Sequence, residues 1–105
     1  MGFFASTDKV VELGNGNTVT LHKVTFGGYQ EAQSKAMRIS GEGLQLDWPK
    51  LRIEVLKRSV VAWDGPGFDG QLPTAENIER LPVEVGNKLA EEAMSLATIG
   101  DEAGN

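Results

Sequence analysis

The chain has 105 residues, of which 40% are hydrophobic and 24% charged, and it contains no cysteine. Its length predicts one domain over residues 1–105 with a single modest core. The lack of cysteine excludes a disulfide framework, a thiolate metal site and a cysteine nucleophile, and it fits a reducing cytosol. The net charge of −5 argues against general nucleic-acid binding, because a phosphate backbone favours clustered Lys and Arg.

The sequence predicts no association with a membrane. Its beginning, MGFFASTDKV, lacks the basic start and the sustained apolar run of a secretory signal. No window approaches the roughly 20 apolar residues that are needed to span a bilayer.

Charge is distributed unevenly along the chain, with a balance of +2 in residues 1–63 and −7 in residues 64–105. We expect the two halves to attract each other within the molecule and the remaining acidic face to be solvated. The alternative is that the acidic half faces a basic partner.

Residues 9–24 predict a β-hairpin. The runs KVVEL and TVTLHKV are rich in Val and Thr, and the second alternates, with Val19 and Leu21 on one face. GNGN at 14–17 supplies the positive-φ positions of a tight turn. No helix follows Gly-x-Gly here, so it is not a nucleotide loop. Because an isolated hairpin is marginal in water, we expect it to pack on helices or to pair with another chain.

Helical spacing begins after the hairpin. Tyr29, Ala32, Ala36 and Ile39 recur on one face, which predicts a helix from about Gly28 to Ile39. The glycines of the following SGEG segment are expected to end this helix.

The most apolar segment predicts the central helix of the core, ending at Trp63. Pro49 suits the first turn of this helix, with Asp47 or Trp48 at or just before the cap. Two apolar stripes predict that the helix is covered on most sides. A strand over RIEVL (52–56) is the alternative, because its apolar residues also alternate.

The loop DGPGFDG then crosses to two further helix starts. Thr74 is a good N-cap for a short helical turn at 75–81. After Pro82, apolar spacing predicts an amphipathic helix from about Val83 to Ile99. Residues 100–105 are expected to form a flexible acidic tail. The fold class predicted is α+β, with the N-terminal hairpin packed on a bundle of about three main helices in the helical part, 28–99.

No combination of residues predicts catalysis, a metal site or a cofactor. His22 lies in an alternating strand without a neighbouring nucleophile or orienting acid, so a surface or cross-strand role is expected. Asp64 and Asp69 flank the glycine loop without the spacing of an EF-hand, and we expect them to form Asx-type turn bonds.

Two groups of residues are candidate contacts for a protein partner. The basic group forms either a recognition patch or the solvated edge of a buried helix; its members are Lys50, Arg52, Lys57 and Arg58. Trp48 and Phe68 pack in the core by default, but if exposed they would anchor a partner.

Structural roles are expected for a further set, and burial of its tryptophan predicts that Trp63→Ala lowers stability by about 3–5 kcal/mol. This set is Trp63, Pro66, Thr74, Leu81 and Pro82.

Three phrases make the chain resemble the tail assembly chaperones of long-tailed bacteriophages, the small proteins encoded just before the tape measure protein. They are V-x-L-x-K-V at 19–24, VVAWDGPGFDG at 60–70 and LPTAENIERLPVEVGNKLAEEAMSL at 72–96. The resemblance extends over residues 10–99, and its motifs are structural rather than catalytic.

The resemblance implies a non-enzymatic protein of the host cytoplasm that binds and solubilises the tape measure protein. The resemblance also implies that the protein helps the major tail protein to polymerise and that it is absent from the mature virion. In many phages, such proteins also have a longer form made by a ribosomal frameshift. Helix-in-groove capture and self-association are natural expectations for such a role. The alternative function is a structural protein of the tail or head–tail connector that stays in the particle.

Overall fold

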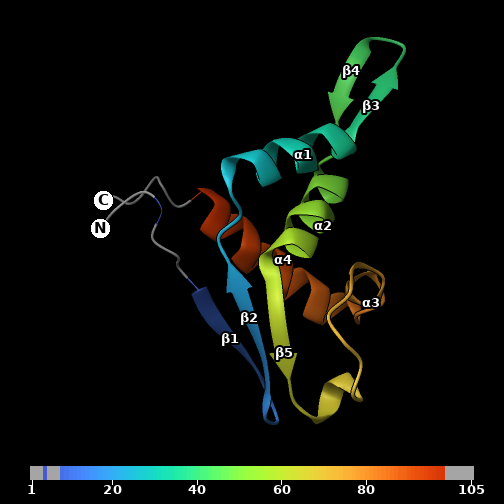
Figure 1. Ribbon diagram of the computed structural model, residues 1–105. Coiled ribbons are helices and arrows are strands. Elements are labelled where there is room, and N and C mark those ends of the chain that lie inside the picture. Colours follow the sequence, from blue (N-terminus) through green and yellow to red (C-terminus); the bar gives the residue numbers. More distant parts are fainter. Residues whose placement is uncertain (1–3, 5–7, 99–105) are drawn as a thin grey trace.

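The N-terminal hairpin forms as its alternating pattern predicts. The computed structural model describes Phe4 and residues 8–98, and in it β1 (Asp8–Gly14) pairs antiparallel with β2 (Asn17–His22) (Figure 1). The turn uses positive φ angles at Gly14, Asn15 and Gly16, which glycine and asparagine tolerate best. The predicted hairpin is confirmed.

The first helix is shorter than predicted. α1 (Phe26–Ala36) begins at an N-cap in which the Thr25 Oγ1 accepts a hydrogen bond from the Gly28 amide at 3.0 Å. It ends at Ala36, and the next residues form β3 (Met37–Ser40), which pairs antiparallel with β4 (Gly43–Leu46). The predicted extension of the helix to Ile39 is therefore wrong.

The reason is that Ile39 fits two periodicities. It continues the apolar helical spacing, but it also alternates with polar neighbours on a strand. The turn is closed by Ser40, whose Oγ accepts from the Glu42 amide and donates to the Gly43 carbonyl, each at 3.2 Å. Gly43 also has a φ of 109°, which favours glycine. A hairpin turn thus forms at the glycines that were expected only to end a helix.

The central helix begins as predicted and ends early. α2 (Trp48–Ser59) is capped by Asp47, whose Oδ1 accepts from the Lys50 amide at 3.1 Å. The helix stops at Ser59, and β5 (Val60–Asp64) follows. The predicted helix up to Trp63 and the alternative strand over RIEVL are both wrong.

β5 lies beside β2 and completes a three-stranded antiparallel sheet of order β1-β2-β5. The Ser59 hydroxyl donates to the His22 carbonyl at 2.7 Å and so fixes the point where helix becomes strand. β-Branched Val60 and Val61 suit a strand. The hairpin therefore gains a third strand from its own chain.

The last third of the chain follows its local signals. The loop contains the short 3-10 helix η1 (Pro66–Phe68), and α3 (Ala75–Glu79) is capped by the predicted Thr74, whose Oγ1 accepts from the Asn77 amide at 3.1 Å. α4 (Val83–Thr98) confirms the predicted final helix. Ile99 and the predicted flexible tail lie outside the described residues.

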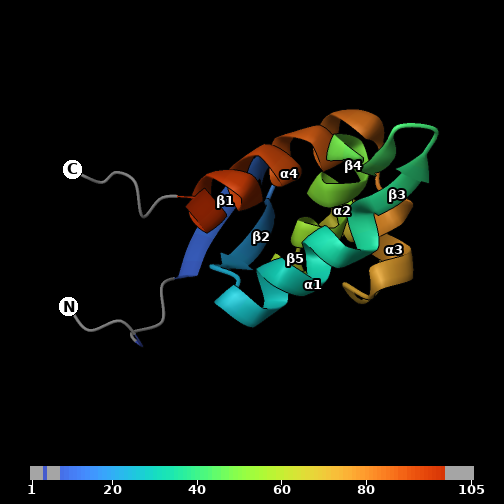
Figure 2. The same ribbon diagram turned by 90° about the horizontal axis from the view of Figure 1, so that it is seen from above.

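The fold is α+β, as predicted, with α2 between α1 and α4 (Figure 2). α4 crosses one face of the sheet, where the Lys9 ammonium lies 2.5 Å from a Glu92 carboxylate oxygen. Among the described residues, no helix has the length and apolar character to cross a membrane. The core is built from the three-stranded sheet, η1 and the four α-helices. Its buried hydrophobic residues are Val11, Val19, Leu21, Ala32, Ala36, Leu51, Val55, Leu56, Val60, Phe68, Ile78, Leu89, Ala90, Ala93 and Leu96.

Candidate functional site

An open groove of about 330 Å³ lies between the start of α2, the connection from α3 to α4, and the first half of α4. We call it the α2–α4 groove. Ile53 and Val83 on its walls are 39% and 78% exposed. Its apolar lining includes Pro49, Ile53, Leu56, Ile78, Leu81 and Val83.

The spacing of α2 explains how the groove forms. Leu51, Val55 and Ser59 lie on one face of the helix and are buried in the core. The second apolar stripe of this segment is Ile53, Leu56, Val60 and Trp63. Ile53 and Leu56 line the groove, where Ile53 is partly exposed and Leu56 is buried. Within this stripe, Ile53 is the residue that adds accessible apolar surface to the groove.

The groove surface is largely apolar. Its charged neighbours are already engaged, because the Arg52 guanidinium donates to the Asn87 carbonyl at 3.4 Å and Glu79 pairs with Lys57. No group of three or more His, Cys, Asp or Glu among the described residues could hold a metal ion. The remaining surface suits apolar side chains.

Trp48 is a predicted partner contact that the structure leaves accessible. It is the first residue of α2, it is 60% exposed, and it precedes Pro49 of the groove. A large exposed aromatic beside an apolar groove is a typical anchor in protein interfaces.

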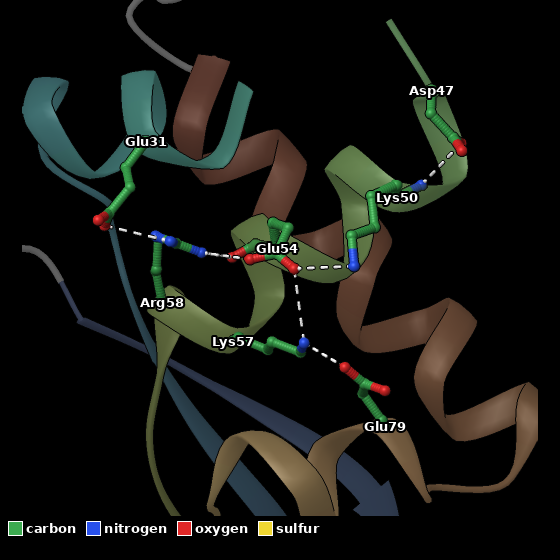
Figure 3. A network of polar contacts seen from close by, with 7 residues as sticks. All are labelled: Glu31, Asp47, Lys50, Glu54, Lys57, Arg58 and Glu79. Atoms are coloured by element: carbon green, nitrogen blue, oxygen red, sulfur yellow. Dashed lines mark hydrogen bonds and ion pairs between the residues drawn. The ribbon is translucent and has the colours of Figure 1, made fainter. Parts of the chain in front are cut away.

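Three cations of the basic group, Lys50, Lys57 and Arg58, form an ionic network around Glu54 (Figure 3). The Glu54 side chain is only 6% exposed, and its carboxylate lies 2.8 Å from an Arg58 nitrogen, 3.4 Å from the Lys50 Nζ and 3.5 Å from the Lys57 Nζ. These three cations therefore share one buried carboxylate. The spacings i−4, i+3 and i+4 place all three beside Glu54 on one helix.

The network also ties α2 to its neighbours. Arg58 continues to Glu31 on α1, with a nitrogen–oxygen distance of 3.1 Å, and Lys57 continues to Glu79 on α3 (Figure 3). The Lys57–Glu79 pair joins the two halves of opposite charge balance, as the Lys9–Glu92 pair does. The expected attraction between the halves is confirmed at these two contacts.

The network predicts that stability depends on pH. Burial alone raises the pKa of Glu54, but the hydrogen bond from Arg58 and the charges of Lys57 and Lys50 outweigh burial and hold that pKa below its ordinary value. A depressed folded-state pKa stabilises the fold above the unfolded pKa of about 4.3, and the contribution disappears as pH falls through the folded value.

We expect Glu54→Gln to lower the free energy of unfolding by about 2 kcal/mol at pH 7, because Lys50, Lys57 and Arg58 lose the buried carboxylate that they share. The difference from the wild type should shrink as pH falls below about 4.3. Urea unfolding at several pH values measures it. Glu91→Gln, at an exposed position on α4, is the control and should change stability by less than about 0.5 kcal/mol. A Glu54→Gln deficit that is independent of pH would contradict the electrostatic explanation.

The aromatic pair at the crossover loop has a structural role. Trp63 stacks on Phe68 with ring centroids 4.4 Å apart, and the Trp63 indole N–H donates to the Gln71 carbonyl at 2.6 Å. Phe68 is 9% exposed, so it takes the core position expected by default and is not an exposed anchor for a partner. Its position in a glycine-rich loop gave no sign that a neighbouring aromatic would cover it.

The predicted structural residues of this region take different positions. Pro66 is exposed at the start of η1, and Pro82 is exposed immediately before α4. Leu81 is partly buried against the core and also lines the groove.

The loop is held by a residue that sequence reasoning did not identify. The Asn17 Oδ1 accepts a hydrogen bond from the Gly67 amide at 2.8 Å. Among the described residues, neither Asp64 nor Asp69 forms a side-chain hydrogen bond, so the predicted Asx-type bonds are absent there. Nothing local in the sequence connects Asn17 with a loop 50 residues further along the chain.

His22 has the predicted cross-strand role. Its Nδ1 lies 2.6 Å from an Asp8 carboxylate oxygen, and the two residues are opposite each other in the β1–β2 register. This arrangement is a surface pair on a sheet.

A second apolar surface lies on the hairpin of β3 and β4, residues 37–46, which we call the arm. It projects beyond the ends of α1 and α2 (Figure 1). Cross-strand pairs Met37–Leu46 and Ile39–Leu44 place four apolar side chains on one face. Met37, Ile39 and Leu44 are 45%, 84% and 69% exposed.

The groove and the arm are thus accessible apolar surfaces of the described chain. No protein-family model matches the chain, and no curated protein or solved structure is significantly similar to it. The two accessible apolar surfaces and the sequence resemblance therefore are the indications of function.

Proposed function

We propose that this protein is a tail assembly chaperone of a long-tailed bacteriophage and that it binds the tape measure protein through the α2–α4 groove. The observation that carries the proposal is an accessible apolar groove whose charged neighbours are already paired. The proposal also rests on the resemblance over residues 10–99. It accounts for the physical needs of such a role, which are an apolar capture surface and a charged exterior, without a reaction centre.

The proposed occupant is an amphipathic helical segment of the tape measure protein. Such a helix presents apolar side chains at i, i+3, i+4 and i+7, and a groove between two helices receives them in one row. The groove volume of about 330 Å³ is at the lower end of the range for small-molecule sites, about 300–1,000 Å³. A space of this size suits a few side chains of a docked helix, with Trp48 as an aromatic anchor at its end.

In this role the chain acts in the host cytoplasm without catalysis or a cofactor, and it assists the major tail protein before leaving the assembly. The alternative is a structural component of the tail or head–tail connector. Mass spectrometry of purified particles separates the two functions, because stoichiometric copies in the mature virion would contradict the chaperone.

The groove is tested by one matched pair of substitutions. Val83 and Phe26 are each the first residue of a helix, and they are 78% and 82% exposed. Aspartate is favourable near a helix N-terminus, so both variants should fold. Only Val83 lines the groove.

We expect co-expression of the wild-type chain to raise the soluble yield of the tape measure protein. Val83→Asp should weaken binding by at least about tenfold, because a charge enters an apolar contact, whereas Phe26→Asp should retain activity. Soluble yield and co-purification measure the effect. Equal activity of Val83→Asp and wild type would reject the groove, and no effect of the wild type would reject the chaperone.

A further inference from the structure

Gly86 is the one glycine among the residues of α4, and it lies in the first half of that helix. A glycine inside a helix is less favourable than an alanine, because glycine loses more conformational freedom when the chain folds. For the stability of the helix itself, alanine would therefore suit this position better.

Nothing within the described chain requires a glycine at this position. Gly86 is not among the described residues with a positive φ, and it lies within a regular helix. A Cβ added there would meet no described atom within 4 Å, whereas a Cβ at Gly65 would lie 2.6 Å from the Asn17 Cα. The missing side chain thus leaves open space, and because Gly86 lines the α2–α4 groove, that space is part of the groove.

The groove face of α4 has the spacing of a hole in helix packing. Its residues recur at i, i+3, i+4 and i+7, and they are Val83, Gly86, Asn87 and Ala90. Four residues at this spacing form the hole that receives one side chain, the knob, of a facing helix. Because two of the four are glycine and alanine, this hole is deeper than one lined by larger side chains.

The facing wall of the groove, on α2, has residues at the same spacing: Pro49, Arg52, Ile53 and Leu56. The Arg52 guanidinium reaches across to the Asn87 carbonyl on α4 at 3.4 Å and so connects the two walls beside Gly86. Ile53 and Val83 expose apolar surface on either side. A deep hole between apolar walls fits a large apolar knob.

We propose that Gly86 determines which side chain the groove accepts from the tape measure protein. The open space at Gly86 receives a large aliphatic or aromatic side chain of the docked helix. This assignment rests on the function proposed above and adds the position and size of one partner side chain. A small side chain would leave part of the hole empty and would lose the contacts with its lining.

Gly86→Ala should make the free protein more stable. We expect its Tm to rise by about 2–6 °C, because alanine favours the helix and its Cβ enters open space. Thermal unfolding followed by circular dichroism measures the shift. A lower Tm would show that Gly86 serves packing within the chain, and this would overturn the proposal whatever the tape measure protein does.

Binding should change in the opposite direction to stability. The wild type and one variant are co-expressed at equal levels with a tagged tape measure protein, and mass spectrometry measures the ratio of the two that is captured. Gly86→Ala should be captured about fivefold less than the wild type, and Gly86→Leu at least about tenfold less, because their side chains fill the hole.

Gly27 provides the matched control. It is an exposed glycine in the first turn of α1, outside the groove, and a Cβ there would also meet no described atom within 4 Å. Gly27→Ala and Gly27→Leu should therefore be captured as well as the wild type.

The outcomes separate this proposal from the proposed function. Equal or stronger capture of both Gly86 variants, together with loss of Val83→Asp, would overturn the role of Gly86 and leave the groove as the binding site. A wild-type chain that is not captured would overturn the proposed function and the role of Gly86 with it. Far-UV circular dichroism of each variant shows that the fold is retained.

Discussion

Trp63→Ala is expected to lower the free energy of unfolding by about 3 kcal/mol, the lower end of the range for a buried aromatic. We expect the lower end of this range because Trp63 is only partly buried. The substitution removes the stack on Phe68 and the hydrogen bond to the Gln71 carbonyl. It also leaves space opposite Val19, its partner in the β2–β5 register. Urea unfolding followed by circular dichroism measures the change.

Trp63→Phe separates the two contributions. It retains an aromatic ring against Phe68 but cannot donate to Gln71, so it should cost only about 1 kcal/mol. If the alanine variant lost less than about 1 kcal/mol, Trp63 would contribute little to closing the core and its importance would have to lie at an interface.

Gly65→Ala is the second substitution with a large expected effect, at least about 3 kcal/mol. Gly65 has φ 129° and ψ 162°, a conformation that is essentially restricted to glycine. A Cβ there would also lie 2.6 Å from the Asn17 Cα and 2.7 Å from the Gly16 carbonyl oxygen. Backbone strain and backbone overlap therefore add, and neither contact is with a side chain that could rotate away.

Gly70→Ala is the matched control in the same loop. Gly70 also has a positive φ, 72°, but a Cβ there meets no atom within 4 Å. Gly70→Ala should lower the free energy of unfolding only by the cost of a positive φ for alanine, about 1–2 kcal/mol. Thermal and urea unfolding of both variants measure the difference. Equal losses would show that the close approach of the loop to the β1–β2 turn contributes nothing.

These two positions explain how the loop closes the fold. Asn17 in the hairpin turn accepts from Gly67, while the absence of a side chain at Gly65 lets the loop backbone approach the same turn. The DGPGFDG loop therefore has a structural role at the end of the sheet. It crosses from β5 to α3 rather than between two helices.

Elements with strong local signals were predictable. The hairpin followed from alternation around GNGN, and α3 from Thr74 as an N-cap. α4 followed from apolar spacing after Pro82. In each case the deciding residues lie within a few positions of one another, so the chain specifies the element locally.

Residues 37–40 and 60–64 were assigned to helices because their apolar residues continued a helical spacing. Ile39 instead alternates on β3, and β5 forms because β2 offers an open strand edge. Strand pairing depends on residues distant in the chain, about 40 positions away for Thr20 and Ala62. The residues near each segment therefore do not reveal that it will pair as a strand.

The candidate surfaces also separate into features that local sequence determines and features that tertiary packing determines. The sequence by itself determined the hairpin, the helix caps, the amphipathic α4 and the exclusion of cysteine chemistry, because these depend on residue type and short spacing. Only the tertiary structure decided that Glu54 is buried, that Lys57 and Arg58 continue to Glu79 and Glu31, that Phe68 is covered, and where the groove and the arm are exposed. Burial and ionic pairing are properties of the packed elements, and these elements come together only when distant segments of the chain meet.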